Sequence, residues 1–487
     1  MTAELWTWNE LIAAMPGCVA EGRPSAAITG FSIDTRSLMR GEVFVALKDQ
    51  RDGHEFVTSA AKAGSAAAIV SRDYQKHSGD GALLRVDDPL QALEHLGVAA
   101  RARLSSKARV VAVTGSAGKT GTKEMLRACL ARLGKVHASE KSYNNHWGVP
   151  LTLARMPADA HYAVFEIGMN HAGEIGSLVK LVSPHAAIVT TVEAVHIAHF
   201  HSVEDIADAK AEIFSGLEPA GFAIIKRASP HFDRLAGHAR AHQAKVISFG
   251  LISDANVYAE KIELSGEASE ITACIGEKSI TYRLAIPGSH VAENSLAVAA
   301  ALQAIGADVA TALGALADLP PPDGRGARVL LTTQTNGQPS GHALLIDESY
   351  NANPASMRAV LATLGTLPRD RFQRRIVVLG DMLELGPQAG ELHRGLQPAI
   401  DAAGVDLVFA CGPNMKGLYE SLRPAIKGSY FETAAALEPA LVAEIRSGDV
   451  VMVKGSNGLK LGLLVGALRR RYGEVSSPVF SSPDSRA

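Results

Sequence analysis

A glycine-rich loop between a buried strand and a helix constrains the fold of this chain more than any other feature. The apolar run VVAVTG at residues 110–115 leads into TGSAGKT, and a helical pattern follows at once. In loops of this kind, backbone N–H groups turn inward on a phosphate, Lys119 would neutralise its β and γ oxygens, and the Thr120 hydroxyl can ligate Mg²⁺. Val113 stands where the general pattern has its first glycine, so a glycine-rich turn with a solvated lysine is the alternative. The order of strand, loop and helix predicts a nucleoside triphosphate site in a parallel α/β domain.

The chain length and two segments that interrupt regular structure predict three parts. The chain has 487 residues, and at roughly 150 residues per domain this predicts about three domains. The polar segment 101–109 leads into the strand at residue 110. The segment LADLPPPDGRGAR, which ends at Arg328, has the strongest clustering of proline and glycine in the chain, and these residues interrupt helices and strands. We therefore predict the following parts: domains at 1–107, 108–322 and 323–487, with a disordered tail from about residue 476.

Strand and helix patterns give each part an α/β fold. The first part mixes short β-rich runs with Ala-rich segments and predicts a small α/β domain. In the second, apolar strands alternate with helices as in βαβ units, so we expect a doubly wound sheet with an antiparallel extension at 256–286. The third repeats an apolar strand followed by a helix and predicts a Rossmann-like sheet. Its strands end near Asp347, Asp381 and Lys454, which would face one rim of that sheet.

Composition excludes several classes of protein. The formal net charge is −2, which provides no global field to hold nucleic acid or a membrane surface. No stretch approaches the roughly 18 uninterrupted apolar residues of a membrane span, and the N-terminus lacks the pattern of a signal peptide. The four cysteines are more than a hundred residues apart, too dispersed for a CxxC site. We expect a cytoplasmic protein, and a monomer, that uses no nucleic acid or membrane partner.

The shortened loop TGSAGKT is similar to that of the Mur ligases, ATP-dependent amide-forming enzymes of peptidoglycan precursor synthesis, and to that of folylpolyglutamate synthetases. Within the Mur ligases, the chain resembles the branch that adds D-alanyl-D-alanine to UDP-N-acetylmuramoyl-tripeptide. The motifs that carry this resemblance are SYNNHWGVPLTL (142–153), FEIGMNHAGEI (165–175), DAKAEIF (208–214), IDESYNANPASM (346–357), LGDMLELG (379–386) and KGSNGLKL (454–461). The segment DTRSLMRGEVFVALKDQRDGHEF (34–56) is similar to the uridine-nucleotide domain that this branch shares with the diaminopimelate/lysine-adding one, whose DNPR-type motif is absent.

The resemblance implies where ATP binds. Arg325 would meet the phosphates, with Arg328 as its rival, and Asp347 would meet the ribose. The implied ATP-binding residues are Thr114, Gly115, Ser116, Ala117, Gly118, Lys119, Thr120, Asn294, Arg325 and Asp347.

The resemblance also implies a metal site, which we expect to hold two Mg²⁺ ions. Thr120 and Glu166 would hold the first, because magnesium prefers few carboxylates together with water and phosphate oxygens; a strand-end carboxylate that caps the next segment is the alternative for Glu166. His196 and a carbamylated Lys210 would support the second, and with Lys119 they would be the catalytic residues. His199 and His201 are the rivals of His196. A solvated lysine is the alternative for Lys210, which lies in a helix that Ser202 would cap.

The substrate-binding residues are likewise implied. Those for the nucleotide-sugar peptide are Thr35, Arg36, Lys48, Asn144 and Asn145, with a solvated surface charge as the alternative for Lys48. Those for the dipeptide are Asp381, His393 and Lys454. Asn351 is favoured over Asn353, because Asn353-Pro354 is also a helix start.

Three other functions stay open from the residues alone. A related ligase with another acid and amine, such as a folate polyglutamylating enzyme, is the nearest. A P-loop ATPase or kinase comes next, and a binding module without catalysis is last. In the expected reaction, the third domain closes, excludes water and protects an acyl phosphate until the amine attacks. Neither the third residue of the peptide nor the acceptor of the amine proton follows from the sequence.

Overall fold

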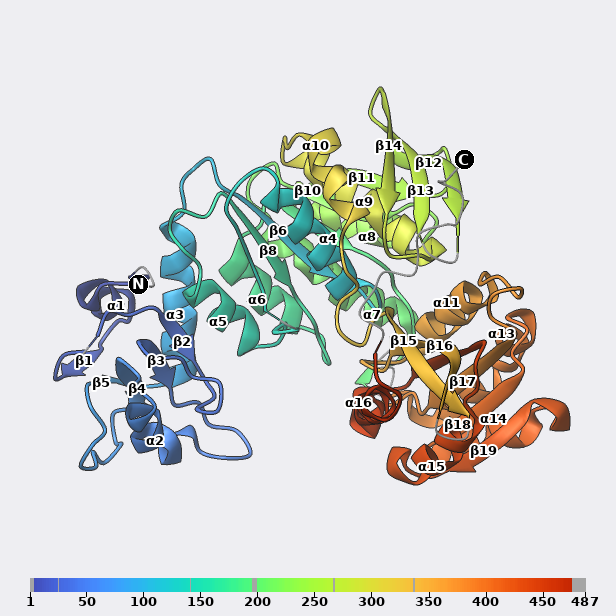
Figure 1. The fold of residues 1–487 in the computed structure, drawn as a ribbon. Helices are drawn as coiled ribbons and strands as arrows, with labels where there is room; N and C mark the ends of the chain where they lie inside the picture. Colours follow the sequence, from blue (N-terminus) through green and yellow to red (C-terminus); the bar gives the residue numbers. More distant parts are fainter. Residues whose placement is uncertain are drawn as a thin grey trace, which may run out of the picture.

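The described chain forms three separate α/β sheets with their own helices (Figure 1). This arrangement confirms the predicted three-part α/β architecture. The expected tail from residue 476 and His196 lie outside the described residues. The computed structural model describes residues 4–24, 26–140, 142–194, 199–265, 268–335 and 338–474.

The first sheet has the strand order β1-β5-β4-β3-β2, parallel except for the pair β1 and β5. Strands β2 to β5 are mostly buried, whereas β1 is largely exposed at the edge. This domain packs on the middle one, where Trp6 Nε1 donates to Ala154 O at 2.9 Å. Its elements are α1 (Trp8–Ala14), β1 (Val19–Glu21), β2 (Gly30–Ser32), β3 (Glu42–Val45), η1 (Gly53–Phe56), α2 (Val57–Lys62), β4 (Ala67–Ser71), β5 (Leu83–Val86) and α3 (Pro89–Ala102).

The middle sheet has the order β14-β13-β12-β11-β10-β9-β6-β8-β7. The strands from β7 to β12 are parallel, and β12, β13 and β14 form the expected antiparallel extension. Its strands are β6 (Arg109–Thr114), β7 (Val136–Ala138), β8 (Tyr162–Glu166), β9 (Ala186–Val189), β10 (Phe222–Lys226), β11 (Lys245–Gly250), β12 (Val257–Leu264), β13 (Ser269–Ile275) and β14 (Lys278–Leu284). Its helices are α4 (Lys119–Ala131), α5 (Gly148–Ala154), α6 (Glu174–Val182), α7 (Val203–Ala211), η3 (Glu212–Gly216), α8 (Phe232–Ala241), α9 (Ser289–Ala304), α10 (Val309–Leu313) and η4 (Gly314–Ala317).

The third sheet has the order β15-β16-β20-β17-β18-β19, with β15 antiparallel to β16 and the rest parallel. Its strands are β15 (Ala327–Thr335), β16 (Gln338–Glu348), β17 (Arg374–Gly380), β18 (Leu407–Cys411), β19 (Lys427–Phe431) and β20 (Asp449–Lys454). Its helices are α11 (Pro354–Gly365), η5 (Gly386–Gln388), α12 (Ala389–Arg394), α13 (Gln397–Ala402), η6 (Pro413–Met415), α14 (Lys416–Ser421), η7 (Pro424–Ile426), α15 (Ala434–Glu444), η8 (Asn457–Leu459) and α16 (Leu461–Tyr472).

Helix starts follow the expected side-chain rules. Ser202 caps α7 by accepting a hydrogen bond from the N–H of Asp205 at 3.1 Å. Asn353 caps α11, accepting from Ser356 N at 2.8 Å, with Pro354 in the first turn. Among the described residues, no helix has the length and apolar composition that a membrane crossing requires.

Candidate active site

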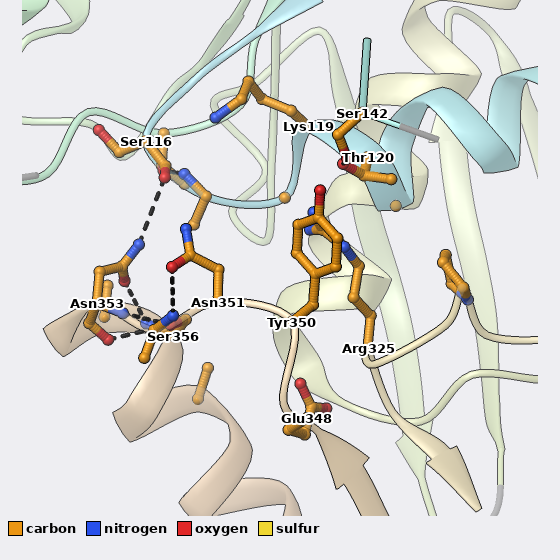
Figure 2. Close-up of a pocket in the computed structure, with 18 of the residues that line it drawn as sticks. Ser116, Lys119, Thr120, Ser142, Arg325, Glu348, Tyr350, Asn351, Asn353 and Ser356 are labelled. Carbon is orange, nitrogen blue, oxygen red and sulfur yellow. Dashed lines mark hydrogen bonds between the residues drawn. The ribbon is translucent and has the colours of Figure 1, made fainter. Parts of the chain in front are cut away.

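A cavity of about 1010 Å³ lies between the middle and third domains. Figure 2 shows the phosphate loop on one side of this space and the loop after β16 on the other. The middle domain contributes that loop, the carboxyl end of β8 and the start of α9; the third contributes the ends of β16 and β20 and the start of α11. The carboxyl ends of parallel strands thus face a common space, as expected for a ligand site in α/β sheets.

The phosphate loop is held in shape by glycines and by threonine side chains. A Cβ on Gly115 would overlap Thr190, and one on Gly118 would lie 2.5 Å from the Asn294 amide nitrogen. Both glycines have positive φ, of 146° and 82°, which L-residues rarely adopt. Thr190 Oγ1 donates to Ala117 O at 2.6 Å. The loop is therefore pre-shaped, and Asn294 lies against its last glycine.

Lys119 begins α4 and bends back over the loop. Its ammonium donates to Gly115 O at 2.7 Å. Burial lowers the pKa of Lys119, an effect that the Arg325 charge strengthens and the Glu166 charge opposes. Two neighbouring positive charges, Lys119 and Arg325, fit the binding of phosphate oxygens.

Thr120 and Glu166 form the buried polar centre of the cavity wall. Thr120 Oγ1 donates to Glu166 Oε2 at 2.8 Å, and Asn144 Nδ2 donates to the other carboxylate oxygen at 2.7 Å. Thr120 is 5% exposed and Glu166 is 1% exposed. Ser142 Oγ lies 3.5 Å from Thr120 Oγ1. These oxygen donors, with one carboxylate, fit a Mg²⁺ ion that keeps waters and phosphate oxygens as its other ligands.

Lys210 is buried near this centre, at 2% exposure in α7. Burial lowers its pKa well below the ordinary value, and the Lys119 charge acts in the same direction. Within the described ranges, no carboxylate charge is among the causes that shift this pKa, and no three His, Cys, Asp or Glu side chains cluster as metal ligands. His199, a rival of His196, instead lies with its ring centroid 4.6 Å from that of His171.

Several charged side chains reach the cavity from the third domain and the linker before it. Lys454 Nζ donates to Asn351 O at 2.9 Å and lies 3.7 Å from Glu348 Oε2. Burial raises the pKa of Glu348, while the Lys454 and Arg325 charges oppose this rise. The guanidinium carbon of Arg325 lies 4.1 Å from the centroid of the Tyr350 ring. The fold therefore brings together three of the predicted residues, Lys454, Asn351 and Arg325. Two residues that the sequence did not single out, Glu348 and Tyr350, lie beside them.

His290 lines the cavity at the start of α9. Burial lowers its pKa to about 4, with a contribution from the Lys454 charge. Among the described residues its Nδ1 has no hydrogen-bond partner. His290 is thus a neutral ring at neutral pH, between the two domains.

Asn353 has a second role beyond its helix cap. Its Nδ2 donates to Ser116 O, in the phosphate loop, at 3.4 Å (Figure 2). The sequence favoured Asn351 because the Asn-Pro pair explains Asn353 as a helix start. In the structure Asn353 is a helix start and also joins the third domain to the phosphate loop.

Asp347 faces a different space from Glu348, since neighbouring strand residues point to opposite sides. It lines an adjacent cavity of about 410 Å³, with Tyr350 among the residues common to both cavities. Its Oδ1 accepts from Ser349 N at 3.0 Å and from Ser349 Oγ at 2.6 Å.

Asp381 and His393 do not line the large cavity. The Asp381 carboxylate is 1% exposed and accepts hydrogen bonds from Asn414 and from Met415 N. His393 Nε2 accepts from Met382 N at 2.9 Å, its Nδ1 donates to Ala389 O at 2.5 Å, and burial lowers its pKa. Both side chains hold segments around the cavity rather than open into it.

In the first domain, the predicted residues also lie outside this cavity. Arg36 is paired with Asp34 at 2.6 Å and its side chain is 88% exposed. Lys48 Nζ lies 3.7 Å from Asp52 Oδ2 and is 77% exposed. Thr35 is half-buried. Asn144 and Asn145, by contrast, line the cavity, and Asn145 Oδ1 accepts from Gly148 N at 2.9 Å.

Comparison with known proteins decides the family. The family model of the Mur ligase middle domain matches residues 113–302, and that of the Mur ligase glutamate ligase domain matches residues 333–457. The UDP-N-acetylmuramoyl-tripeptide--D-alanyl-D-alanine ligase of Escherichia coli (strain K12) is 36% identical over 440 residues, 90% of this chain and 92% of that protein. This chain belongs to the Mur ligase family.

Solved structures of Mur ligases share the whole architecture. A crystal structure of MurF from Acinetobacter baumannii has a TM-score of 0.81 and 28% identity, and covers 96% of this chain and 100% of that one. The MurF ligase of Thermotoga maritima in complex with ADP has a TM-score of 0.75 and 22% identity, covering 91% of this chain and 97% of that one. The Mur ligase fold of this chain therefore extends across all three sheets.

Proposed function

We propose that this Mur ligase adds D-alanyl-D-alanine to UDP-N-acetylmuramoyl-tripeptide with conversion of ATP to ADP and phosphate, in peptidoglycan precursor synthesis. The observation that carries this proposal is the 36% identity over 90% of the chain to a ligase of that name. The phosphate loop beside the Thr120–Glu166 pair supports it, because amide formation in water requires an activated acid.

ATP is assigned to the large cavity. Backbone N–H groups of residues 114–120 and the N-terminus of α4 would hold its phosphates, with Lys119 and Arg325 as counter-charges. Asn294 lies against the loop on the side where α9 begins. Asp347 would meet the ribose only after the two adjacent cavities become one space. The nucleotide in the Thermotoga maritima structure is consistent with this assignment.

Mg²⁺ fits the oxygen donors of Thr120 and Glu166, and when bound it would neutralise charge on the phosphate oxygens. A second ion would be supported by His196 and by carbamylated Lys210. The buried Lys210 amine, with its lowered pKa, is chemically suited to condense with CO₂. The carbamate would give this side chain a negative charge, which could support the second ion.

The UDP-sugar peptide is assigned to the first domain and to Asn144 and Asn145. Thr35, Arg36 and Lys48 are exposed or half-buried and available to a nucleotide diphosphate. The dipeptide is assigned to the third-domain side of the cavity, where Lys454 and Asn351 are. Asp381 and His393 serve it indirectly, by holding the segments that carry Leu383 and Ser456.

The boundaries near residues 107 and 322 are proposed on the division of the strands among three sheets. We also propose that the enzyme acts as a monomer in the cytoplasm, where its nucleotide substrates are.

The chain's own residues account for most of the proposed chemistry. The phosphate loop and Lys119 bind and orient the terminal phosphate, so that the peptide carboxylate can attack it, form an acyl phosphate and release ADP. Closing of the third domain excludes water. The dipeptide amine then attacks the acyl carbon, and the tetrahedral intermediate collapses to amide and phosphate.

Two measurements test this function. In an ADP-release assay, turnover should require both UDP-N-acetylmuramoyl-tripeptide and D-alanyl-D-alanine. Mass spectrometry of the product should show a gain of one dipeptide less one water. ADP release that ignores the amine would instead favour a P-loop ATPase or kinase, and turnover with a folate and glutamate would favour the polyglutamylating alternative.

A further inference from the structure

The chain passes from the middle domain to the third domain within a few residues. Leu319 is still buried in the core of the middle domain, at 6% exposure. Three prolines follow at 320–322, and their rings fix φ near −65°. From Gly324 onward, backbone hydrogen bonds join the chain to the third domain. The chain therefore crosses from the middle domain to the third domain at the proline segment 320–322.

Arg325 lies on the third-domain side of this change. The N–H of Gly326 donates to Asp347 O at 2.8 Å, and the N–H of Tyr350 donates to Gly324 O at 3.1 Å. Gly324 has a φ of 67°, and a Cβ there would lie 3.0 Å from the backbone nitrogen of Tyr350. The segment that carries Arg325 is thus attached on both sides to the end of β16 and the loop after it. A movement of the third domain moves Arg325 with it.

The Tyr350 ring lies against the Arg325 guanidinium. The guanidinium carbon lies 4.1 Å from the ring centroid, within the range of a cation–π contact. Both side chains line the large cavity, and Figure 2 shows them side by side, extending toward Thr120 and Ser142. An arginine has many rotamers, and a ring that covers one face of its guanidinium removes most of them.

Glu348 offers the same guanidinium another partner. It lies two residues before Tyr350, lines the same cavity, and is close enough for the Arg325 charge to act on it. Without the ring, Arg325 would be able to turn toward this carboxylate. In the structure, the guanidinium lies beside the ring, and both extend toward the phosphate-loop side of the cavity (Figure 2).

We propose that Tyr350 is a positioning residue for Arg325: its ring face holds the guanidinium toward the phosphate loop, so that closure of the third domain delivers an oriented cation to the terminal phosphate of the nucleotide. A cation that is already oriented stabilises the charge of the transferring phosphoryl group without reorganising during the reaction. This inference rests on the proposed function for the identity of the reaction. It assigns Tyr350 no contact with the substrate.

The test is a double-mutant cycle in the full chain, with the variants Tyr350→Leu, Arg325→Ala and their combination, and Tyr350→Phe as the conservative variant. ADP release is measured with all substrates present. Tyr350→Leu should lower kcat by about 3- to 30-fold, the range that corresponds to the cation–π energy. Tyr350→Phe keeps the ring and should stay within about threefold of the parent. In the Arg325→Ala background, Tyr350→Leu should have almost no further effect.

Two results would overturn the proposal. The first is an equal loss of kcat in Tyr350→Phe and Tyr350→Leu, since the hydroxyl rather than the ring face would then matter. The second is an undiminished effect of Tyr350→Leu without Arg325. Thermal unfolding checks that each variant is folded. If Tyr350→Leu is unfolded, Tyr350→Met, which also lacks the ring, takes its place with the same expected results.

A binding measurement separates this proposal from the proposed function. Fluorescent ATP and ADP analogues are titrated into the parent and the variants without acid or amine. Tyr350→Leu and Arg325→Ala should weaken the preference for ATP over ADP to a similar extent, and Tyr350→Phe should retain it. If the parent fails to release ADP with the named substrates, the proposed reaction is wrong, and this ratio still decides the role of Tyr350. An unchanged ratio in Tyr350→Leu contradicts that role.

Discussion

Thr120 Oγ1 donates a hydrogen bond of 2.8 Å to Glu166 Oε2, although the two residues are 46 positions apart in the chain. The contact forms because β6 and β8 are neighbouring parallel strands, with Val113 opposite Glu166 in their register. The phosphate loop leaves β6 at the same rim where β8 ends. One buried carboxylate is thereby fixed beside the hydroxyl that follows the loop lysine.

Glu166→Gln should lower turnover by about 10²- to 10³-fold, the effect of losing one preorganised electrostatic group. Glutamine can still accept the Thr120 hydrogen bond, but its amide nitrogen cannot accept the one from Asn144, so the free energy of unfolding should fall by about 1 kcal/mol. ADP release over a range of Mg²⁺ concentrations measures the first effect, and urea unfolding the second. Glu140→Gln, which removes an exposed carboxylate paired with Arg155, is the matched control. Parent-like turnover of Glu166→Gln would contradict the assignment of Glu166 to the metal.

The local parts of this site could be predicted from the sequence. A loop between a buried strand and a helix identifies Lys119 and Thr120, and a polar residue after an apolar run identifies Glu166 and Lys454. These signals depend on residues close together in the chain. The edge strands β15 and β19 were not predicted. Strand β19 is only half-buried along its length and lacks the continuous apolar pattern of a central strand.

Contacts between distant segments could not be predicted in this way. The sequence explains Asn353 as a helix cap, but its bond to Ser116 depends on how two domains meet. Strand-end position made Asp381 a candidate for the substrate site, yet backbone and side-chain donors of residues 414 and 415 occupy its oxygens. Position in the chain shows that a polar group is at the rim; only the fold shows which partner it meets.

Acidification should destabilise the protein through His290. Its pKa is lowered from 6.5 to about 4 by burial, so the unfolded chain binds the proton first as the pH falls. The stability that the neutral ring contributes is therefore fully present above pH 6.5 and is lost between pH 6.5 and about 4. At pH 5 the loss in the free energy of unfolding amounts to about 2 kcal/mol. His290→Leu should lose less stability than the parent over this window. Urea unfolding at neutral pH and at about pH 5 measures the difference, with the exposed His342→Leu as the control. Equal pH dependence in His290→Leu and the parent would show that this ring is not buried in its neutral form.

Asn353 has two separable roles. Asn353→Ser keeps a capping oxygen but loses the Nδ2 donor to Ser116, so stability should change by less than about 0.5 kcal/mol while the KM for ATP rises. Asn353→Ala loses both and should cost about 1 kcal/mol of stability as well. Steady-state kinetics and urea unfolding of the two variants distinguish the roles. An unchanged KM in Asn353→Ser would mean that the bond to the phosphate loop has no part in nucleotide binding.

Lys210 should carry a carbamate when CO₂ is supplied. Its amine is buried in α7, and the lowered pKa favours the neutral form, whose lone pair can attack CO₂ to form a carbamate with release of one proton. Nuclear magnetic resonance of the protein equilibrated with ¹³C-bicarbonate should show one carbamate carbonyl signal that is absent in Lys210→Ala and present in Lys180→Ala, which changes an exposed lysine of α6. Turnover of the parent should fall in CO₂-depleted buffer and return when bicarbonate is added. A signal that survives in Lys210→Ala would place the modification on another amine.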